Sequence, residues 1–299
     1  MKTLIIGSKG FIGTHCFNHF IKQGHKVYGC DVVVDYTAKN YFLVDATNAN
    51  YQDVFEKEKF DVCINCSGAA NVQDSIANPQ RDFQLNTVNV FSLLNAIKTH
   101  NPECKFINLS SAAVYGHPER LPVQENQALQ PISPYGFHKK YAEEICLQFN
   151  SQFNIKTCSL RIFSAYGPGL KKQLFWDLYK KIEKTDTIEL FGTGEESRDF
   201  IYIDDLVIAI EKVIKSAQFK GEYINVASGK ELMIKDVSTI FIEIVNKTKS
   251  IRFNKKQKPG DPKNWVADIS VLSSFGFLPN YNLNQGLTNY IKWIKNEKL

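Results

Sequence analysis

Two side chains near the middle of the sequence form a candidate proton-transfer pair. Tyr135 and Lys139 are four residues apart, so on a helix they share one face and lie one turn from each other. A free tyrosine titrates near 10 and is a poor base at neutral pH, but a neighbouring positive charge favours its phenolate. Lowering the tyrosine pKa by about three units requires roughly 4 kcal/mol of differential stabilisation. Tyr135 is therefore the predicted general base, with Lys139 as its cationic partner.

The same pair is common on ordinary amphipathic helices, so its meaning depends on a glycine-rich turn near the start of the sequence. The turn carries Gly7, Gly10 and Gly13 between an apolar run at 3–6, suited to a buried strand, and a helical pattern that ends near Gly24. Backbone N–H groups at a helix start attract anions, and glycines let a phosphate approach closely. The turn therefore predicts a pyrophosphate cradle.

An acidic residue lies where a bound dinucleotide needs one. Asp31 ends the next apolar run, about 20 residues past the glycines, and an acid at this place binds the adenosine ribose hydroxyls. A carboxylate there also repels a 2′-phosphate, which favours NAD over NADP. With NAD bound, the cationic nicotinamide adds a second positive charge that favours the Tyr135 phenolate. We therefore predict NAD as the cofactor.

The spacing of the apolar runs indicates the fold that holds these residues. Short apolar runs alternate with helical patterns through the first half of the chain, which is typical of an α/β, Rossmann-type doubly wound parallel sheet. The right-handed crossover rule places helices on both faces and the cofactor across the carboxyl ends of the strands. Ala69, in a stretch of small residues after the fourth run, is a candidate close contact, with a plain tight turn nearly as well supported. We expect strands at 3–6, 26–31, 41–44, 60–67, 105–109 and 157–162, and helices at 48–58, 81–98 and 135–153.

The pattern changes along the chain in a way that indicates two domains. Residues 1–165 form the predicted NAD(P)-binding domain of Rossmann type. Beyond it, prolines and glycines punctuate short elements, which predicts a smaller, mixed α/β substrate domain at 166–299. The segment 195–217 is expected to return to the first domain, because Asp204 and Asp205 favour the start of a helix there.

Composition argues against several classes of protein. The 299 residues are 43% hydrophobic and 22% charged, as in a soluble enzyme, and no apolar stretch is long enough for a membrane span. The apolar start at 1–6 is too short for a signal peptide, and the seven cysteines suit a reducing compartment, so we expect a cytoplasmic protein. The net charge of +5 comes from scattered lysines without the basic stripe of a nucleic-acid site. His15 and His19 lack the neighbouring ligands of a metal site, so no metal is predicted.

Several motifs, in order along the chain, resemble one family. The Gly-x-x-Gly-x-x-Gly spacing at 7–13 resembles the short-chain dehydrogenase/reductase superfamily. The segment 108–116, Asn-Leu-Ser-Ser-Ala-Ala-Val-Tyr-Gly, is similar to the extended, nucleotide-sugar-modifying branch of that superfamily. Further matches lie at 161–168, 198–200 and 259–262. The resemblance therefore covers essentially the whole chain.

The resemblance implies roles that spacing alone does not assign. Ser111 falls on the catalytic serine, whose hydroxyl binds the sugar oxygen that becomes a ketone. Two positions depart from the family pattern: Ser164 replaces an asparagine, and Lys258 replaces an arginine able to bind a phosphate bidentately. The implied substrate contacts are Ser111, Ser164, Arg198, Lys258, Asp261 and Trp265. The implied cofactor contacts are Gly7, Lys9, Gly10, Phe11, Ile12, Gly13, Asp31, Asp45, Ala69, Tyr135 and Lys139.

The resemblance leaves two reactions open on a nucleotide-diphosphate sugar. In the favoured reading, a 4-epimerase oxidises carbon 4 to a transient ketone and returns the hydride to the opposite face. The alternative is an NAD(P)H-dependent 4-keto-6-deoxy-sugar reductase, which Lys9 favours because a basic residue at this place often meets the 2′-phosphate of NADP in related enzymes. Sugar dehydratases need an acid pair after the catalytic serine, where this chain has Ala112 and Ala113. Non-catalytic dinucleotide-binding or RNA-binding relatives typically lack the tyrosine and the lysine.

One tryptophan bears on which sugar is accepted. Trp265 lies four residues after Asp261, at the spacing where related 4-epimerases line the sugar near carbon 2. A bulky side chain at this place predicts exclusion of N-acetyl groups, because overpacking a defined pocket costs about 1 to 3 kcal/mol. The alternative is that Trp265 packs in the core of the smaller domain.

A homodimer is also expected from the resemblance. In related enzymes the helices that correspond to 81–98 and 135–153 pair with their copies in a second subunit around a twofold axis. The candidate contacts, for which core packing is an equal alternative, are Phe91, Leu94, Ile145 and Phe149.

Overall fold

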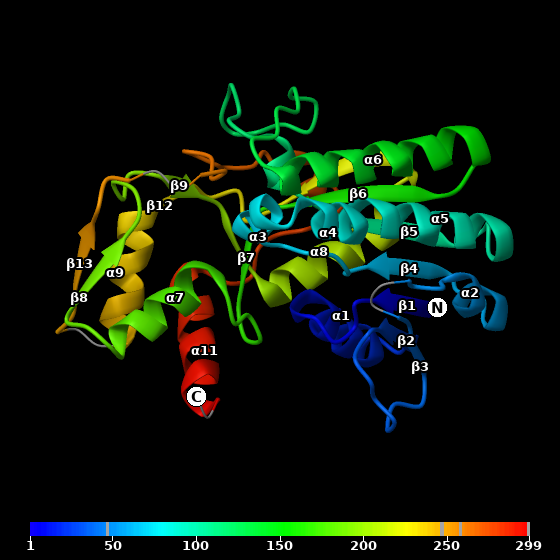
Figure 1. Cartoon of the computed structure of the whole chain (residues 1–299), viewed down its shortest axis with the longest axis horizontal. Helices are drawn as coiled ribbons and strands as arrows, with labels where there is room; N and C mark the ends of the chain where they lie inside the picture. Colours follow the sequence, from blue (N-terminus) through cyan, green and yellow to red (C-terminus); the bar gives the residue numbers. More distant parts are fainter. Residues whose placement is uncertain (46–47, 246–247, 257–258, 298–299) are drawn as a thin grey trace.

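A computed structural model describes residues 1–45, 48–245, 248–256 and 259–297. Its centre is a seven-stranded sheet in the order β11-β6-β5-β4-β1-β2-β3, and every neighbouring pair in it is parallel (Figure 1). The fold is therefore the α/β, doubly wound sheet that the sequence predicts. The strands are β1 (Lys2–Ile6), β2 (Lys26–Asp31), β3 (Tyr41–Leu43), β4 (Val62–Asn65), β5 (Lys105–Ser111), β6 (Thr157–Ile162) and β11 (Lys220–Val226).

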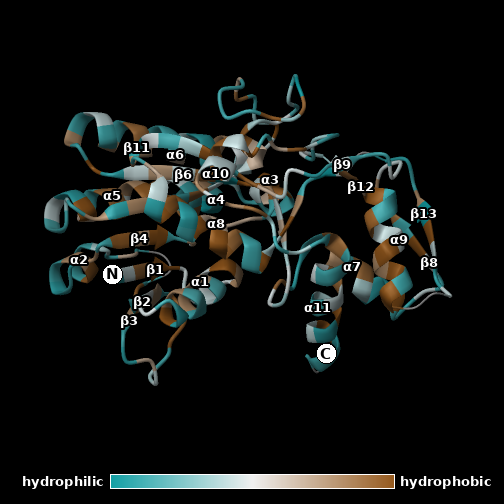
Figure 2. Ribbon diagram, turned by 180° about the vertical axis from the view of Figure 1, so that it is seen from behind, coloured by the Kyte–Doolittle hydropathy of each residue, from teal (hydrophilic) through white to brown (hydrophobic). Residues whose placement is uncertain are grey.

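Alternation along the strands divides the core between the two faces of the sheet. Ile5 packs in a cluster with α1 (Phe11–Lys22) and α8 (Ile203–Ser216), whereas its neighbours Leu4 and Ile6 pack in another cluster. Successive side chains of a strand point to opposite faces, so a strand covered on both sides reads as a continuous apolar run. The strand β4 shows this pattern, being buried along its length and mostly brown in Figure 2. The second face is covered by α2 (Gln52–Lys57), α5 (Asn89–His100) and α6 (Pro134–Phe153).

Two parts of the expected secondary structure were wrong in detail. The single helix expected at 81–98 is a series of three elements, α4 (Pro79–Phe83), the π-helical turn η1 (Gln84–Val88) and α5, preceded by α3 (Val72–Ala77). The sheet also has a seventh strand, β11, which the sequence pattern did not predict. Its sequence, Lys-Gly-Glu-Tyr-Ile-Asn-Val, begins with polar residues and contains a bulge, because it is an edge strand whose first half is only partly covered.

The remaining elements form a smaller region beyond the carboxyl ends of the sheet strands (Figure 1). Its helices are α7 (Gln173–Ile182), α9 (Ile234–Val245) and α11 (Leu283–Asn296), whereas α10 (Ser270–Ser274) packs against β11 and α8 beside the central sheet (Figure 2). Three two-stranded sheets join distant segments, pairing β7 (Ser164–Tyr166) with β10 (Phe200–Tyr202), β8 (Thr187–Leu190) with β13 (Ser250–Phe253), and β9 (Ser197–Arg198) with β12 (Leu232–Met233). Among the residues described, no helix combines the length and the hydrophobicity that crossing a membrane requires.

Candidate active site

The glycine-rich turn between β1 and α1 forms a tight backbone cradle. Gly7 has φ +75°, and a Cβ built on it would lie 2.8 Å from the backbone nitrogen of Ser67. A Cβ on Gly13 would lie only 2.0 Å from the carbonyl oxygen of Gly7. The first turn of α1 can therefore lie this close to the loop only because residue 13 has no side chain. Gly10 caps α1 without a side-chain hydrogen bond, and the first turn of the helix carries no acidic residue. The N–H groups at this helix start can therefore receive a phosphate.

Asp31, at the end of β2, closes one side of this cradle. Its carboxylate accepts hydrogen bonds from the backbone N–H of Lys9 at 2.8 Å and of Val32 at 2.7 Å. The ammonium of Lys9 forms an ion pair with Asp35, and this contact holds the pKa of the Asp35 carboxyl well below its usual range. The positive charge of Lys9, which was the sequence argument for NADP, is therefore already neutralised.

The opposite side of the cradle carries a polar side chain that the sequence pattern did not single out. Asn86 lies in η1, is 1% exposed, and has no hydrogen-bond partner for either its amide nitrogen or its amide oxygen. A Cβ on Gly68 would lie 2.5 Å from the Asn86 oxygen, so the amide faces the loop that follows β4 and contains Ala69. π-Helical turns often occur at functional sites, but a π-turn has no recognisable residue spacing. The one signal in the sequence was an asparagine within an apolar helical run.

The helix α6 places the predicted proton-transfer pair. Ser133 caps the helix by accepting a hydrogen bond from the N–H of Gly136, and Pro134 occupies its first turn, so the helix begins just before Tyr135. Tyr135 and Lys139 are 8% and 5% exposed, and the Lys139 Nζ lies 6.0 Å from the centroid of the Tyr135 ring. The same Nζ donates a hydrogen bond to the carbonyl oxygen of Leu109 at 2.8 Å, which ties it to β5.

Burial acts on both groups of the pair. It raises the pKa of Tyr135 to about 12, opposite to the lowering predicted from the sequence, although the Ser111 hydroxyl acts in the lowering direction. Burial also lowers the pKa of Lys139 to about 8, against the raising effect of nearby acidic groups. The structure thus brings together Ser111, Tyr135 and Lys139, the three residues expected to carry the chemistry. Ser111 ends β5, where its hydroxyl also accepts the N–H of Ala113 at 3.2 Å.

Three of the expected substrate residues lie together in the smaller region. Arg198 donates to the carbonyl oxygen of Lys263 at 3.0 Å, and its guanidinium lies 5.5 Å from the centroid of the Trp265 ring. Burial lowers the pKa of Arg198, and the charge of Asp261 acts in the opposite direction. Trp265 donates its indole N–H to the carbonyl oxygen of Gly116 at 3.2 Å, so it contacts the segment that follows the catalytic serine.

Other expected contacts are less closely joined to this group. Ser164 is half-buried in β7, and its backbone N–H donates to the carbonyl oxygen of Asp199 at 3.0 Å. Asp45 is exposed after β3 and accepts the N–H of Asn48 at 3.0 Å. The expected diphosphate contact Lys258 lies outside the described residues.

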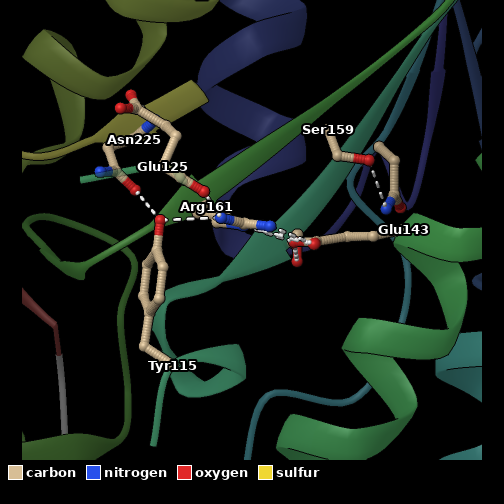
Figure 3. A network of polar contacts seen from close by, with 8 residues as sticks. Tyr115, Glu125, Glu143, Ser159, Arg161 and Asn225 are labelled. Atoms are coloured by element: carbon tan, nitrogen blue, oxygen red, sulfur yellow. Dashed lines mark hydrogen bonds and ion pairs between the residues drawn. The ribbon is translucent and has the colours of Figure 1, made fainter. Parts of the chain in front are cut away.

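A buried network of hydrogen bonds centred on Arg161 connects the elements that carry the catalytic residues (Figure 3). Arg161, in β6, binds the Glu143 carboxylate through Nε at 3.0 Å and Nη2 at 2.8 Å, and both side chains are 1% exposed. The guanidinium also donates to the Tyr115 hydroxyl at 2.9 Å, which in turn donates to Asn225 at 2.7 Å. Glu143 lies one turn beyond Lys139 on α6. The network therefore fixes α6, β6, the segment after β5 and β11 relative to one another.

Comparison with known proteins identifies the family. Residues 3–227 match the sequence profile of the NAD dependent epimerase/dehydratase family. The chain belongs to this family.

Three known proteins are similar to the chain over nearly its whole length. UDP-glucuronic acid 4-epimerase from Bacillus cereus, solved in complex with UDP-glucuronic acid and NAD, is 28% identical with a TM-score of 0.89, and the match covers 99% of both chains. UDP-N-acetylglucosamine 4-epimerase from Methanobrevibacter ruminantium, solved with UDP-N-acetylmuramic acid, is 26% identical with the same TM-score and covers 99% of this chain and 98% of its own. The Bacillus subtilis protein named uncharacterized UDP-glucose epimerase YtcB is 29% identical over 312 residues, which is 98% of each chain.

As a member of the NAD-dependent epimerase/dehydratase family, the protein is an NAD-dependent enzyme. The shape of the cradle and the polar groups around it also fit NAD. The cradle has no room for side chains at Gly7 and Gly13, as close backbone approach to a pyrophosphate requires. A carboxylate is present at Asp31, and the buried amide of Asn86 has unused donor and acceptor atoms beside the loop after β4.

Proposed function

We propose that the protein is a 4-epimerase of a UDP-hexose, acting through a transient 4-keto sugar. The observation that carries this proposal is the joining of Ser111, Tyr135 and Lys139 at the carboxyl end of β5. The named relatives that act on UDP-sugars support UDP as the carrier. The reductase alternative gains no support from them, and the pairing of Lys9 with Asp35 removes its main argument.

The residues of the chain divide the chemistry among them. Tyr135 takes the proton from the sugar 4-hydroxyl and later returns it, while the Ser111 hydroxyl holds that oxygen in place. The Lys139 ammonium stabilises the Tyr135 phenolate, because an adjacent positive charge in a buried site favours the anion. Bound NAD would supply the acceptor for the hydride from carbon 4 and its return to the other face of the ring. Gly7, Gly10, Gly13, Asp31 and Asn86 are the residues that would hold it.

Arg198, Asp261, Trp265 and Ser164 are proposed to line the nucleotide-sugar site. The contacts of Arg198 with Trp265, and of Trp265 with Gly116, support this assignment because they join the region beyond the sheet to the segment after Ser111. The proposal divides the chain into a cofactor part at 1–165, with 195–217 and the strand β11 returning to it, and a substrate part formed by the rest of 166–299. Packing of α8 against α1 supports the return of the middle segment.

We also propose a homodimer, with a contact surface formed by the exposed apolar side chains of α5 and α6. Leu94 and Phe149, two of the expected contacts, are buried in the core, and Ile145 is partly buried against it. Phe91 is 48% exposed on α5. The face of α6 adds Phe137 and Tyr141, both 42% exposed, and these apolar side chains support a helix-to-helix contact between two copies. A cytoplasmic location is likewise proposed, supported by seven cysteines that are all free.

The test of the function is incubation of purified protein with UDP-glucose, UDP-glucuronic acid and UDP-N-acetylglucosamine, with and without added NADPH. A 4-epimer formed without NADPH from at least one of them is the expected result. Consumption of NADPH with a 4-keto sugar, and no epimer from any sugar, would contradict the proposal.

A further inference from the structure

One buried carboxylate holds two distant backbone segments together. Asp199 lies between β9 and β10 and is 0% exposed. Its Oδ1 accepts hydrogen bonds from the Ser228 N–H at 2.8 Å and from the Ser228 hydroxyl at 2.7 Å. Its Oδ2 accepts from the N–H groups of Gly229 at 3.0 Å and Ala267 at 3.2 Å. The carboxylate thus joins the segment that follows β11 to the segment that contains Trp265.

The four hydrogen bonds suit an ionised side chain at Asp199. Each partner donates, and an ionised carboxylate only accepts. Burial raises the pKa of Asp199, while the hydrogen bonds from Ser228, Ala267 and Gly229 act in the lowering direction. Hydrogen bonds to a charged acceptor are roughly twice as strong as those between neutral groups. The carboxylate therefore holds the two segments more firmly than a neutral side chain would.

The segments that meet at Asp199 carry three of the proposed substrate residues. Arg198 directly precedes it, and Trp265 lies two residues before Ala267. The backbone carbonyl oxygen of Asp199 also accepts the N–H of Ser164 at 3.0 Å. The guanidinium of Arg198 lies 5.5 Å from the centroid of the Trp265 ring, so this contact depends on how the two segments are placed.

The segment that contains Trp265 is attached on both sides of the indole. On one side, the N–H of Ser197 donates to the carbonyl oxygen of Lys263 at 3.2 Å, and the N–H of Trp265 donates to that of Ser197 at 3.2 Å. On the other side, the N–H of Ala267 is held by Asp199. Removing the carboxylate frees one attachment and leaves the other, so the segment should shift without unfolding the chain.

We propose that Asp199 is a positioning residue that holds Trp265 against Arg198 and so sets the shape of the nucleotide-sugar site. The proposal rests on the proposed function for the identity of the substrate, but the placement of Trp265 can be measured without a substrate. Because Asp199 is fully buried, it acts through Arg198 and Trp265 rather than by touching the sugar nucleotide. Its loss should weaken binding of the UDP-sugar and leave NAD binding unchanged, since the cofactor cradle belongs to other segments.

The first measurement follows the tryptophans of the protein without any ligand. With 15N-labelled indole groups, the three tryptophans give three indole N–H signals in an NMR spectrum, and Trp265→Phe identifies that of Trp265. In Asp199→Ala, the Trp265 signal is expected to move or broaden, while the signals of the other two tryptophans stay in place. Asp199→Leu also removes both acceptor oxygens, fills the space, and replaces Asp199→Ala if that variant does not fold.

Asp205→Ala is the matched control. Asp205, on α8, is 1% exposed and accepts the backbone N–H groups of Asn280 at 2.9 Å and Tyr281 at 3.0 Å. It is thus an equally buried carboxylate that holds a different segment. Asp205→Ala should lower the stability of the protein as Asp199→Ala does, but it should leave the Trp265 signal in place.

The second measurement is binding of UDP and of NAD by calorimetry. Asp199→Ala is expected to bind UDP about 10-fold more weakly or worse, the factor that corresponds to losing one hydrogen bond to a charged group, with NAD affinity unchanged. Asp199→Asn keeps one acceptor oxygen and should fall between wild type and Asp199→Ala. In turnover of the accepted UDP-sugar, Asp199→Ala should raise KM more than it lowers kcat.

An unchanged Trp265 signal in folded Asp199→Ala or Asp199→Leu would overturn the proposal. Equal losses of UDP affinity in Asp199→Ala and Asp205→Ala would also overturn it, because they would show that Asp199 only stabilises the fold. If wild type turns over no UDP-sugar, the proposed function fails, while the Trp265 signal still decides whether Asp199 positions the indole.

Discussion

The Ser111 hydroxyl at the end of β5 lies near the Tyr135 phenol at the start of α6 and acts to lower the pKa of that phenol. Because the donor and acceptor roles of two hydroxyls can exchange, the pair can pass a proton to or from the oxygen of a bound sugar. This relationship sets what the variants at the site should do.

Tyr135→Phe should lower turnover by a factor of about 10² or more, the usual scale of general acid–base catalysis, and leave folding and NAD binding nearly intact. Steady-state turnover, NAD content and circular dichroism measure the three properties. Tyr141→Phe is the control, because it removes the same hydroxyl from the exposed side of α6. Equal turnover of Tyr135→Phe and Tyr141→Phe would remove Tyr135 from the mechanism.

Lys139→Ala should lower turnover at least as much as Tyr135→Phe, since it removes the charge that stabilises the phenolate.

Preference for NAD should survive Lys9→Ala, because the Lys9 ammonium is already paired with Asp35. Asp35→Ala frees that ammonium and should strengthen NADP binding, which fluorescence titration with both cofactors can measure. The double variant Lys9→Ala/Asp35→Ala should lose this gain. A fall in NADP affinity in Lys9→Ala alone would show that the ion pair does not occupy the lysine.

Trp265→Ser should admit N-acetylated UDP-sugars if the indole limits the space near carbon 2 of the sugar. The expected change in preference is roughly 5- to 150-fold, from about 1 to 3 kcal/mol of overpacking. Competition between UDP-glucose and UDP-N-acetylglucosamine measures it. Trp293→Ser, which changes a partly buried tryptophan packed against the core on α11, controls for destabilisation. If both variants are destabilised and neither changes the preference between the two UDP-sugars, Trp265 is a packing residue. Its ring contact with Phe163 is consistent with that outcome.

Arg161→Met should lower the free energy of unfolding by about 3–5 kcal/mol, because it leaves the buried Glu143 without its partner. Urea unfolding followed by tryptophan fluorescence measures this loss. Arg161→Met/Glu143→Leu removes both charges and should recover part of it. A double variant less stable than Arg161→Met would show that hydrogen bonds to Ser110 and Tyr115, rather than the paired charge, dominate the network.

The parts of the site that follow from short-range patterns were predictable from the sequence. The glycine turn, and the pair formed by Tyr135 and Lys139, depend on spacings within one strand-turn-helix unit or one helix. The sheet followed in the same way from its apolar runs. Ser111 was placed by family resemblance, and its contact with Tyr135 agrees with that placement.

What escaped prediction depends on contacts between elements far apart in the chain. Asn86 acquires its buried, unpartnered position from a π-turn, which has no residue spacing of its own. The ion pair of Lys9 with Asp35 spans 26 residues, so the sequence argument for NADP could not take it into account. For Leu94 and Phe149 the sequence left dimer contact and core packing as equal alternatives, because helical periodicity alone does not say which apolar face meets the sheet.

The late return of α8 and β11 to the sheet restricts how this enzyme can be divided. A fragment ending at residue 165 would retain the glycine turn, Ser111, Tyr135 and Lys139, yet it would lack β11 and α8, one of the two helices that pack with Ile5. The bare edge of β6 and an uncovered apolar face would favour aggregation over an independent NAD-binding unit. Exchange of substrate regions between relatives would therefore succeed by grafting loops into an intact chain, and fail by joining halves at a single breakpoint.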